Sequence, residues 1–467
     1  MEKLFRLKEH GTNVRTELIA GLTTFVTMAY IIFVNPTILQ NTGMDRGAVF
    51  VATILAAVIG TLVMGLFANV PYAQAPGMGL NAFFTYVVCG ALRFSWQQAL
   101  AIVFICGIIN IIITSTQIRK MLINAIPESL QYAISGGIGL FIAYIGIKQA
   151  HFLNFTSESY NITANLPGGN VIAKDVIPEI VNFRDPVSQL ALIGLIITVV
   201  LMLKNVKGSI LIGIITTTIL GLFIGNVTKL PSMSLADFIP PSIAPTFFKL
   251  DIAGLFEDPS RIFLVLSTVL AFSLSDTFDT VGTFLGTGRK SGIFDDKAEE
   301  DVHKSKGIKT KMDKALFADA TATSIGAVLG TSNTTTYVES TAGISAGGRT
   351  GLTSVFTALF FLLALFLAPV AEMVTAAATA PALIVVGILM MESITKVKWS
   401  EFEEAASAFF TAVIMPFTYS ISNGVAAGFV FYVITKIVKR KAKEVHPILY
   451  IVTLLFVVDF VLRAFRQ

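Results

Sequence analysis

Long apolar runs alternate with short polar connections along almost the whole chain, from residue 18 to residue 438. A run of about 17–25 predominantly apolar residues has the length of a helix that crosses a lipid bilayer. The runs form two series, 18–39, 48–67, 80–92, 97–115, 129–147, 187–203 and 210–224, then 262–285, 315–329, 340–346, 352–370, 376–393, 405–419 and 425–438. A last apolar stretch, 447–465, either adds a span or lies on the membrane. The pattern predicts an all-α polytopic membrane protein with 14 transmembrane segments.

The composition agrees with this class. Apolar residues make up 54% of the 467 residues and charged residues only 14%, whereas a soluble protein carries about 25% charged residues. The net charge of +4 is small, and no basic surface with interleaved aromatic residues indicates nucleic-acid binding. Cys89 and Cys106 lie in apolar context, so neither a disulfide framework nor a metal site is predicted. The first 17 residues lack a signal-peptide pattern, and no cofactor is expected.

The positive charges predict an orientation. With a cytoplasmic N-terminus, the connections after even-numbered spans should carry the excess of Lys and Arg. They do so at Arg119 and Lys120, Lys204 and Lys207, 289–314, Lys396 and Lys398, and 436–443. The longer connections 149–186 and 227–260 follow odd-numbered spans and contain few basic residues. The distribution predicts a multi-pass protein of the cytoplasmic membrane with a cytoplasmic N-terminus, and it supports the count of 14.

The third span of each series is short and interrupted, at 71–82 and at 331–351. The β-branched stretch 334–338 favours an extended chain, and glycines punctuate the residues that follow it. Interrupted spans at corresponding positions of two halves indicate a transporter's binding site. We therefore expect a 7+7 inverted repeat, with short β-strands and half-helices in spans 3 and 10. The alternative is that 331–351 forms a polar loop outside the membrane.

Polar residues at the two interruptions are the candidate binding groups. Glu339 is a carboxylate at membrane depth, which is a functional-site candidate by default. Asn81 lies at the start of the half-helix in span 3, where unpaired backbone N–H groups gather, although it could be only a cap. Gly79 and Thr336 stand beside these two residues and complete the predicted set. A planar polar ligand could be held between the two half-helix ends.

Span 8 contains two further acids, Asp276 and Asp279, three residues apart and so on one helix face. No positive charge precedes Arg289 in this run. Two carboxyl groups without a cation at membrane depth are suited to hold and release a proton. The alternative is that the helix ends near Leu274 and that both acids face the cytoplasm.

Four motifs resemble the AzgA-like adenine/guanine/hypoxanthine permeases, a branch of the nucleobase–ascorbate transporter superfamily. They are DTFDTVGT at 276–283, YVESTAG at 337–343 with GGRTGL at 347–352, PGMGLNAFF at 76–84, and HGT at 10–12 with GLTTFVTMAY at 21–30. The resemblance covers nearly the whole chain. It implies a core domain of spans 1–4 and 8–11 and a gate domain of spans 5–7 and 12–14. The corresponding residues are 1–125 and 261–371 for the core, 126–260 and 372–445 for the gate, and 446–467 for a C-terminal apolar segment.

The resemblance also implies a function. The implied protein is a secondary active transporter that imports purine nucleobases together with protons. Transport in the family uses an elevator-type movement of the core domain against the gate domain, often in a homodimer. By motif, the purine-contacting carboxylate falls on Glu339, the acid of span 8 on Asp276 with Asp279 in support, and the amide of span 3 on Asn81.

Three other classes agree less well with the sequence. A channel is disfavoured because the sequence has no pore-lining ring and no multiple short filter repeats. A related anion transporter should place a cation at the half-helix ends, where this chain has carboxylates. A membrane enzyme is disfavoured because no metal-ligand cluster, nucleophile–histidine pair or phosphate-binding glycine loop accompanies the acids.

Overall fold

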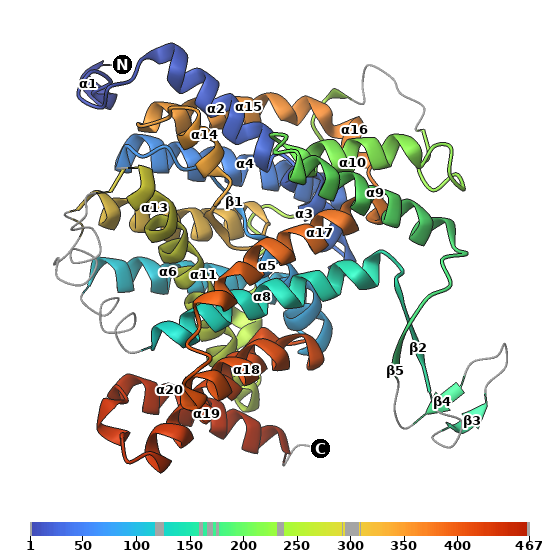
Figure 1. The fold of residues 1–467 in the computed structure, drawn as a ribbon, viewed down its shortest axis with the longest axis vertical. Helices are drawn as coiled ribbons and strands as arrows, with labels where there is room; N and C mark the ends of the chain where they lie inside the picture. Colours follow the sequence, from blue (N-terminus) through green and yellow to red (C-terminus); the bar gives the residue numbers. More distant parts are fainter. Residues whose placement is uncertain are drawn as a thin grey trace.

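The computed structural model describes residues 2–116, 126–157, 162–165, 171–173, 177–230, 238–291, 293–294, 308 and 310–464. The basic connections at 117–125 and 295–307 lie outside the described residues. Helices dominate the fold (Figure 1).

The first series of apolar runs forms helices close to the predicted bounds. After the short α1 (Glu2–Phe5), they are α2 (Val14–Met28), α3 (Ile31–Leu39) with η1 (Gln40–Thr42), α4 (Arg46–Val63) with η2 (Met64–Ala68), α5 (Met78–Ala82) with η3 (Phe83–Ala91), α6 (Trp96–Ser115), α8 (Glu128–Gln149), α9 (Pro186–Leu203) and α10 (Ser209–Leu220). The helices begin where the sequence caps them. The Asp185 side chain accepts from the N–H of Val187 at the start of α9, and Ser95 and Gln98 form a reciprocal capping box at α6.

The second series follows in the same way. It comprises α11 (Ile262–Ser291), α13 (Lys311–Leu329), α14 (Ser340–Ser345), α15 (Gly351–Leu363) with η9 (Ala364–Leu367) and α16 (Ala368–Met373), α17 (Ala376–Met391) with η10 (Glu392–Lys396), α18 (Phe402–Phe417) and α19 (Ile421–Val438). The last apolar stretch forms α20 (Pro447–Ala464) after η11 (Ala442–Glu444), and η7 (Ala253–Leu255) and η8 (Pro259–Arg261) precede α11.

Among the described residues, 8 helical segments are long and apolar enough to cross a membrane, and shorter apolar helices accompany them at Met78–Ala91, Ser209–Leu220, Asn423–Val438 and Pro447–Val458. The fold is therefore that of a polytopic helical membrane protein, while the count of 14 spans stays a prediction. One feature was not predicted in span 1. The helix tightens at Ala29 and Tyr30, whose carbonyls accept hydrogen bonds from the N–H groups three residues later, as in a 3₁₀ turn. Helix α2 ends there and α3 begins.

Among the described residues, three two-stranded sheets interrupt the helices. β1 (Gln74–Pro76) pairs with β6 (Thr334–Thr336) in the middle of the molecule, as the interrupted spans predicted. The other two pairs were not predicted: β2 (Leu153–Thr156) with β5 (Ile177–Ile180), and β3 (Ile162–Asn165) with β4 (Val171–Ala173). They lie in the connection after α8 and project away from the helices (Figure 1).

The helices pack in two groups. In one group, α13 contacts α4 and α6, and α15 contacts α2 and α4. In the other, α8 contacts α17, α18 and α19, while α9 contacts α10 and α17. The buried core that joins them is rich in phenylalanine, including Phe83, Phe84 and Phe141. Helix α5 lies at the boundary and contacts α8.

Candidate functional site

The centre of the site is the antiparallel pair of β1 and β6, in which Gln74 faces Thr336 and Pro76 faces Thr334. Gly77 extends the pairing, because its N–H donates to the Asn333 carbonyl over 2.9 Å. A β-carbon on Gly77 would lie 2.6 Å from Cγ2 of Thr335, so the close approach of the two chains requires glycine. Helix α5 follows β1 and α14 follows β6. The two interrupted spans therefore meet, and each supplies a half-helix whose N-terminus starts beside the shared strands.

Glu339 stands at the N-terminus of α14 and is partly exposed. The Tyr30 hydroxyl donates to its Oε1 over 2.6 Å. Tyr30 is only 1% exposed and comes from the tightened turn between α2 and α3. The structure thus fixes the carboxyl group through Tyr30 while leaving it partly exposed.

Asn81 is fully buried in α5. Its Oδ1 accepts from the Ser332 hydroxyl, and its Nδ2 lies 3.5 Å from the Pro76 carbonyl, which also accepts from the Tyr337 hydroxyl over 2.6 Å. No direct contact joins Asn81 to Glu339 in the described part of the chain. The two predicted residues are connected through Tyr337, whose ring centroid is 6.4 Å from that of Tyr30.

Gly79 lies on the face of α5 that meets α8. A β-carbon there would approach Cγ2 of Ile138 to 2.5 Å, so glycine allows the half-helix to pack closely against α8. The structure gives Gly79 this packing role whether or not a ligand binds nearby.

Asp276 and Asp279 both lie within α11, which continues past them to Ser291. Asp276 is 1% exposed; its Oδ2 accepts from the Asn110 amide over 3.1 Å and from the Thr323 hydroxyl over 3.3 Å. Its Oδ1 is buried without a partner. The Asn110 Oδ1 in turn accepts from the Ser273 hydroxyl. Asp276 therefore faces α6 and α13, inside the first helix group.

Asp279 has different surroundings. It is partly exposed, makes no hydrogen bond with another described residue, and lies close enough to Glu339 to interact electrostatically. Of the two acids in α11, Asp279 is thus the one that shares its environment with Glu339.

Thr336 points away from Glu339, into a buried polar cluster around Asp319 of α13. Asp319 Oδ1 accepts from the Thr336 hydroxyl over 2.7 Å and from the Gln74 amide over 3.2 Å, while Oδ2 accepts from Thr280 over 2.9 Å. Asp319 is 4% exposed. Sequence analysis did not select this residue, although a single acid in the middle of an Ala- and Thr-rich span is a signal of a functional site.

No ion pair joins any of these carboxylates to a cation among the described residues. The nearby Arg349 is a helix-end anchor, since its guanidinium donates to the carbonyls of Ile344 and Gly348 at the end of α14. Its backbone N–H donates to Glu17, a buried residue of α2. The described residues also include no group of three or more His, Cys, Asp or Glu that could hold a metal ion.

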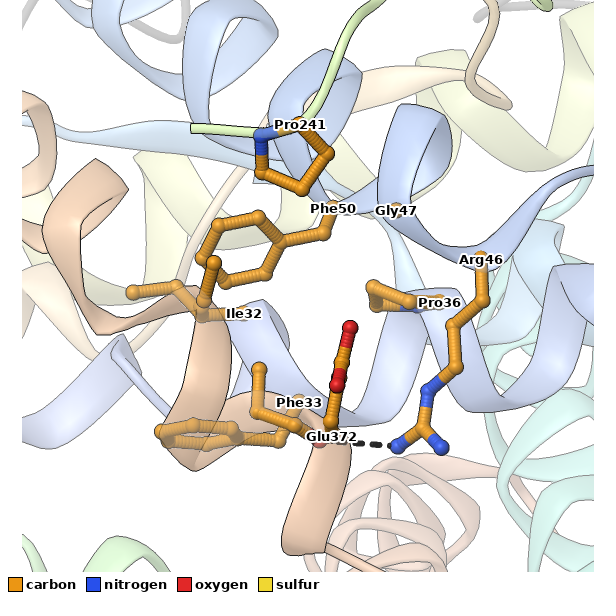
Figure 2. Close-up of a pocket in the computed structure, with 10 residues that line it drawn as sticks. Ile32, Phe33, Pro36, Arg46, Gly47, Phe50, Pro241 and Glu372 are labelled. Carbon is orange, nitrogen blue, oxygen red and sulfur yellow. Dashed lines mark hydrogen bonds between the residues drawn. The ribbon is translucent and has the colours of Figure 1, made fainter. Parts of the chain in front are cut away.

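A cavity among α3, α4 and α16 lies elsewhere and encloses only about 40 Å³ (Figure 2). Phe33 and Phe50 line it, and Arg46 and Glu372 face it. Ligand pockets commonly measure about 300–1,000 Å³, so this cavity has room for water but not for a drug-sized ligand. Arg46 instead donates to the carbonyls of Ala371 and Val374, which fixes the connection between α16 and α17.

Comparison with known proteins now places the chain. A family model described as a permease family matches residues 15–427. The chain belongs to this family of nucleobase–ascorbate transporters. The resemblance inferred from the four motifs is therefore confirmed, and the family consists of permeases rather than enzymes.

Similar proteins match over nearly their whole length. A putative permease of Methanocaldococcus jannaschii is 44% identical over 99% of this chain and 98% of its own. The adenine permease AdeP of Escherichia coli is 40% identical, with 99% and 96% covered, and the guanine/hypoxanthine permease PbuG of Bacillus subtilis is 39% identical, with 99% of both covered.

Solved structures support the fold of this permease. The transmembrane domain of the cyanobacterial bicarbonate transporter BicA matches with a TM-score of 0.59 at 16% identity, covering 88% of this chain and 96% of that one. The structure of SLC26A9 matches with a TM-score of 0.59 at 12% identity, covering 91% and 66%. At these identities the likeness concerns the fold alone.

Proposed function

We propose that this permease is a secondary active transporter that imports purine nucleobases, namely adenine, guanine or hypoxanthine, by proton symport. The observation that carries the proposal is Glu339, a partly exposed carboxyl group at a half-helix end that Tyr30 holds by a hydrogen bond to Oε1. The names of relatives that match over the full chain, adenine permease and guanine/hypoxanthine permease, supply the substrate class.

The chemistry of a purine fits this site. The Glu339 carboxylate accepts from a ring N–H of the base. Asn81, Gly79 and Thr336 complete the proposed site. Asn81 must exchange its bond with Ser332 for one with the base, whereas Thr336 and Gly79 act by shaping the strands and the half-helix.

Asp276 and Asp279 are the proposed proton-coupling residues. Asp276 has a buried oxygen without a partner, which is an atom able to carry a proton. Asp279 lies in electrostatic range of Glu339, so its charge state affects how Glu339 holds a base. A proton taken up by Asp279 would lower its repulsion with Glu339, which shares the site.

Movement of the two helix groups against each other would provide alternating access. The proposed core consists of 1–125 and 261–371, and the proposed gate of 126–260 and 372–445. The proposal includes the cytoplasmic membrane as location, a cytoplasmic N-terminus and 14 spans. The family resemblance adds a homodimer to the proposal.

The decisive test is uptake of tritiated hypoxanthine into proteoliposomes, with and without an inward proton gradient, competed by adenine, guanine, xanthine and uracil. The proposal predicts gradient-driven uptake that some purines block and uracil does not. Absence of uptake of any base by protein that is folded and inserted would contradict the proposed substrate, and anions would be tested next.

A further inference from the structure

A second cavity, of about 430 Å³, opens between the two helix groups at the end of the molecule opposite the start of α2. Its walls come from the turn after α3, from η3, from the end of α8 and from Tyr419, the second residue after α18. Exposed residues at its mouth include Asn41 and Gly90. Its volume lies in the range of about 300–1,000 Å³ common for small-molecule sites.

Two buried polar atoms in the wall of this cavity have no partner. Thr85 is 4% exposed, and its hydroxyl makes no hydrogen bond. Gln149 donates one amide hydrogen to the Tyr86 hydroxyl, and its Oε1 is buried without a partner. If the amide is turned over, the nitrogen is left unpartnered instead, so one polar atom remains unused in either orientation. A buried polar atom without a partner destabilises the protein, and a ligand could supply the missing hydrogen bond.

A cation and aromatic rings stand beside these atoms. Lys148 Nζ lies 4.8 Å from the ring centroid of Tyr419, and no described carboxylate forms an ion pair with it. Tyr419 also meets the edge of Tyr86, with ring centroids 5.9 Å apart. The cavity therefore presents an ammonium donor, an amide, a hydroxyl and apolar ring surface together.

We propose that this cavity is a second binding site, for a purine base that carries a carbonyl oxygen. The inference rests on the proposed function for its substrate class. The ring N–H and C=O edge of an oxopurine pairs with a primary amide such as that of Gln149 in either orientation, and its carbonyl oxygen accepts from Lys148. A simple inorganic anion fits less well, because it leaves the ring surface of Tyr86 and Tyr419 without a partner.

The second cavity shares a helix with the proposed central site. Thr85 follows Asn81 by four residues along the helix formed by α5 and η3, so the cavity's buried end is about one turn from the proposed central site. With a cytoplasmic N-terminus the cavity faces outward. A base would bind there first and then pass to Glu339.

Binding of tritiated hypoxanthine to the purified full-length protein tests this proposal. Glu339→Gln serves to remove binding at the central site. In that background we expect weaker saturable binding to remain, and Lys148→Met or Thr85→Val to weaken it about tenfold, the effect of one lost hydrogen bond of about 1.4 kcal/mol. Thr85→Ser, which keeps the hydroxyl, should restore the binding lost in Thr85→Val. Lys204→Met removes an exposed lysine after α9, at the other end of the molecule, and is the matched control for Lys148.

Each other result has a distinct meaning. If the wild type binds hypoxanthine and Glu339→Gln shows no saturable binding, the second site does not exist, while the proposed function stands. Residual binding that neither Lys148→Met nor Thr85→Val weakens also refutes the second site. Equal displacement by adenine and by unlabelled hypoxanthine refutes the role given to Lys148. If the wild type binds no purine at all, the proposed function itself is wrong.

Discussion

The hydrogen bond from Tyr30 to Glu339 gives a sharp test of the central site. Tyr30→Phe removes one hydroxyl and keeps the ring, which is 1% exposed and packs near Tyr337. The fold should therefore survive. The substitution leaves Glu339 Oε1 without the donor that lies 2.6 Å away.

The size of the effect follows from the kind of bond. A hydrogen bond to a charged group contributes roughly 1.5–3 kcal/mol. Glu339 is partly exposed, so water replaces some of the lost interaction and the lower end applies. A loss of roughly 1.4 kcal/mol corresponds to a tenfold weaker binding of the base. We expect KM for hypoxanthine to rise about tenfold with a smaller change in maximal rate. The reason is that the Glu339 carboxylate is misplaced already when the base is bound, so ground-state binding weakens.

The assay is the initial rate of tritiated hypoxanthine uptake into proteoliposomes under a fixed inward proton gradient. Tyr450→Phe is the matched control, because its hydroxyl donates to the Ala442 carbonyl in η11 and not to a residue of the proposed site. That control should lower the Tm of the protein and leave KM nearly unchanged. A folded Tyr30→Phe protein with wild-type KM would show that this bond does not position a substrate-binding carboxylate.

Four further outcomes are expected. Glu339→Gln should abolish uptake at normal membrane expression, because the nearly isosteric amide puts a donor where an acceptor is needed; uptake is measured beside surface abundance. Asp276→Asn or Asp279→Asn should stop accumulation driven by a pH gradient while leaving exchange of bases across the membrane, and unchanged accumulation in both would move the proton site elsewhere. Asp319→Asn should destabilise the protein by about 1–3 kcal/mol through its mispaired hydrogen bonds, measured as a lower Tm. Lys439 and Lys441 lower the pKa of Glu403 to about 2. The stability that this carboxylate adds is therefore present above its unfolded pKa of about 4.3 and is lost as the pH falls toward 2. Glu403→Gln should lower Tm at pH 7 and have little effect on Tm near pH 2.

Much of the helical pattern could be predicted from the sequence, because each span is a local property of apolar length and capping. The predicted run 187–203 is helix α9, Pro186–Leu203, whose start is set by a capping aspartate and an N-terminal proline. The meeting of the two interrupted spans was also predicted, since interrupted spans at equivalent positions of two halves point to one site.

What the sequence did not predict depends on contacts between distant residues. Nothing local indicates that Tyr30 should reach Glu339, 309 positions away. Asn81 resembles a ligand-binding amide by position, yet Ser332 engages it in a buried bond. The spacing of Asp276 and Asp279 predicts one helix face, but neighbouring helices give the two acids separate environments.

The hydrogen bonds around the strands determine which parts must move together. Gln74 of β1 and Thr336 of β6 both donate to Asp319 of α13, and Thr280 of α11 donates to the same carboxylate. The strands, and with them both half-helices, are thereby tied to α11 and α13. The close contact of α5 with α8 at Gly79 is instead van der Waals packing, which can slide without leaving a buried polar group unpaired. We therefore expect the half-helices to move with α11 and α13 as one body past α8. If that movement occurs, it breaks the bond between Gln149 and Tyr86, both of which line the second cavity.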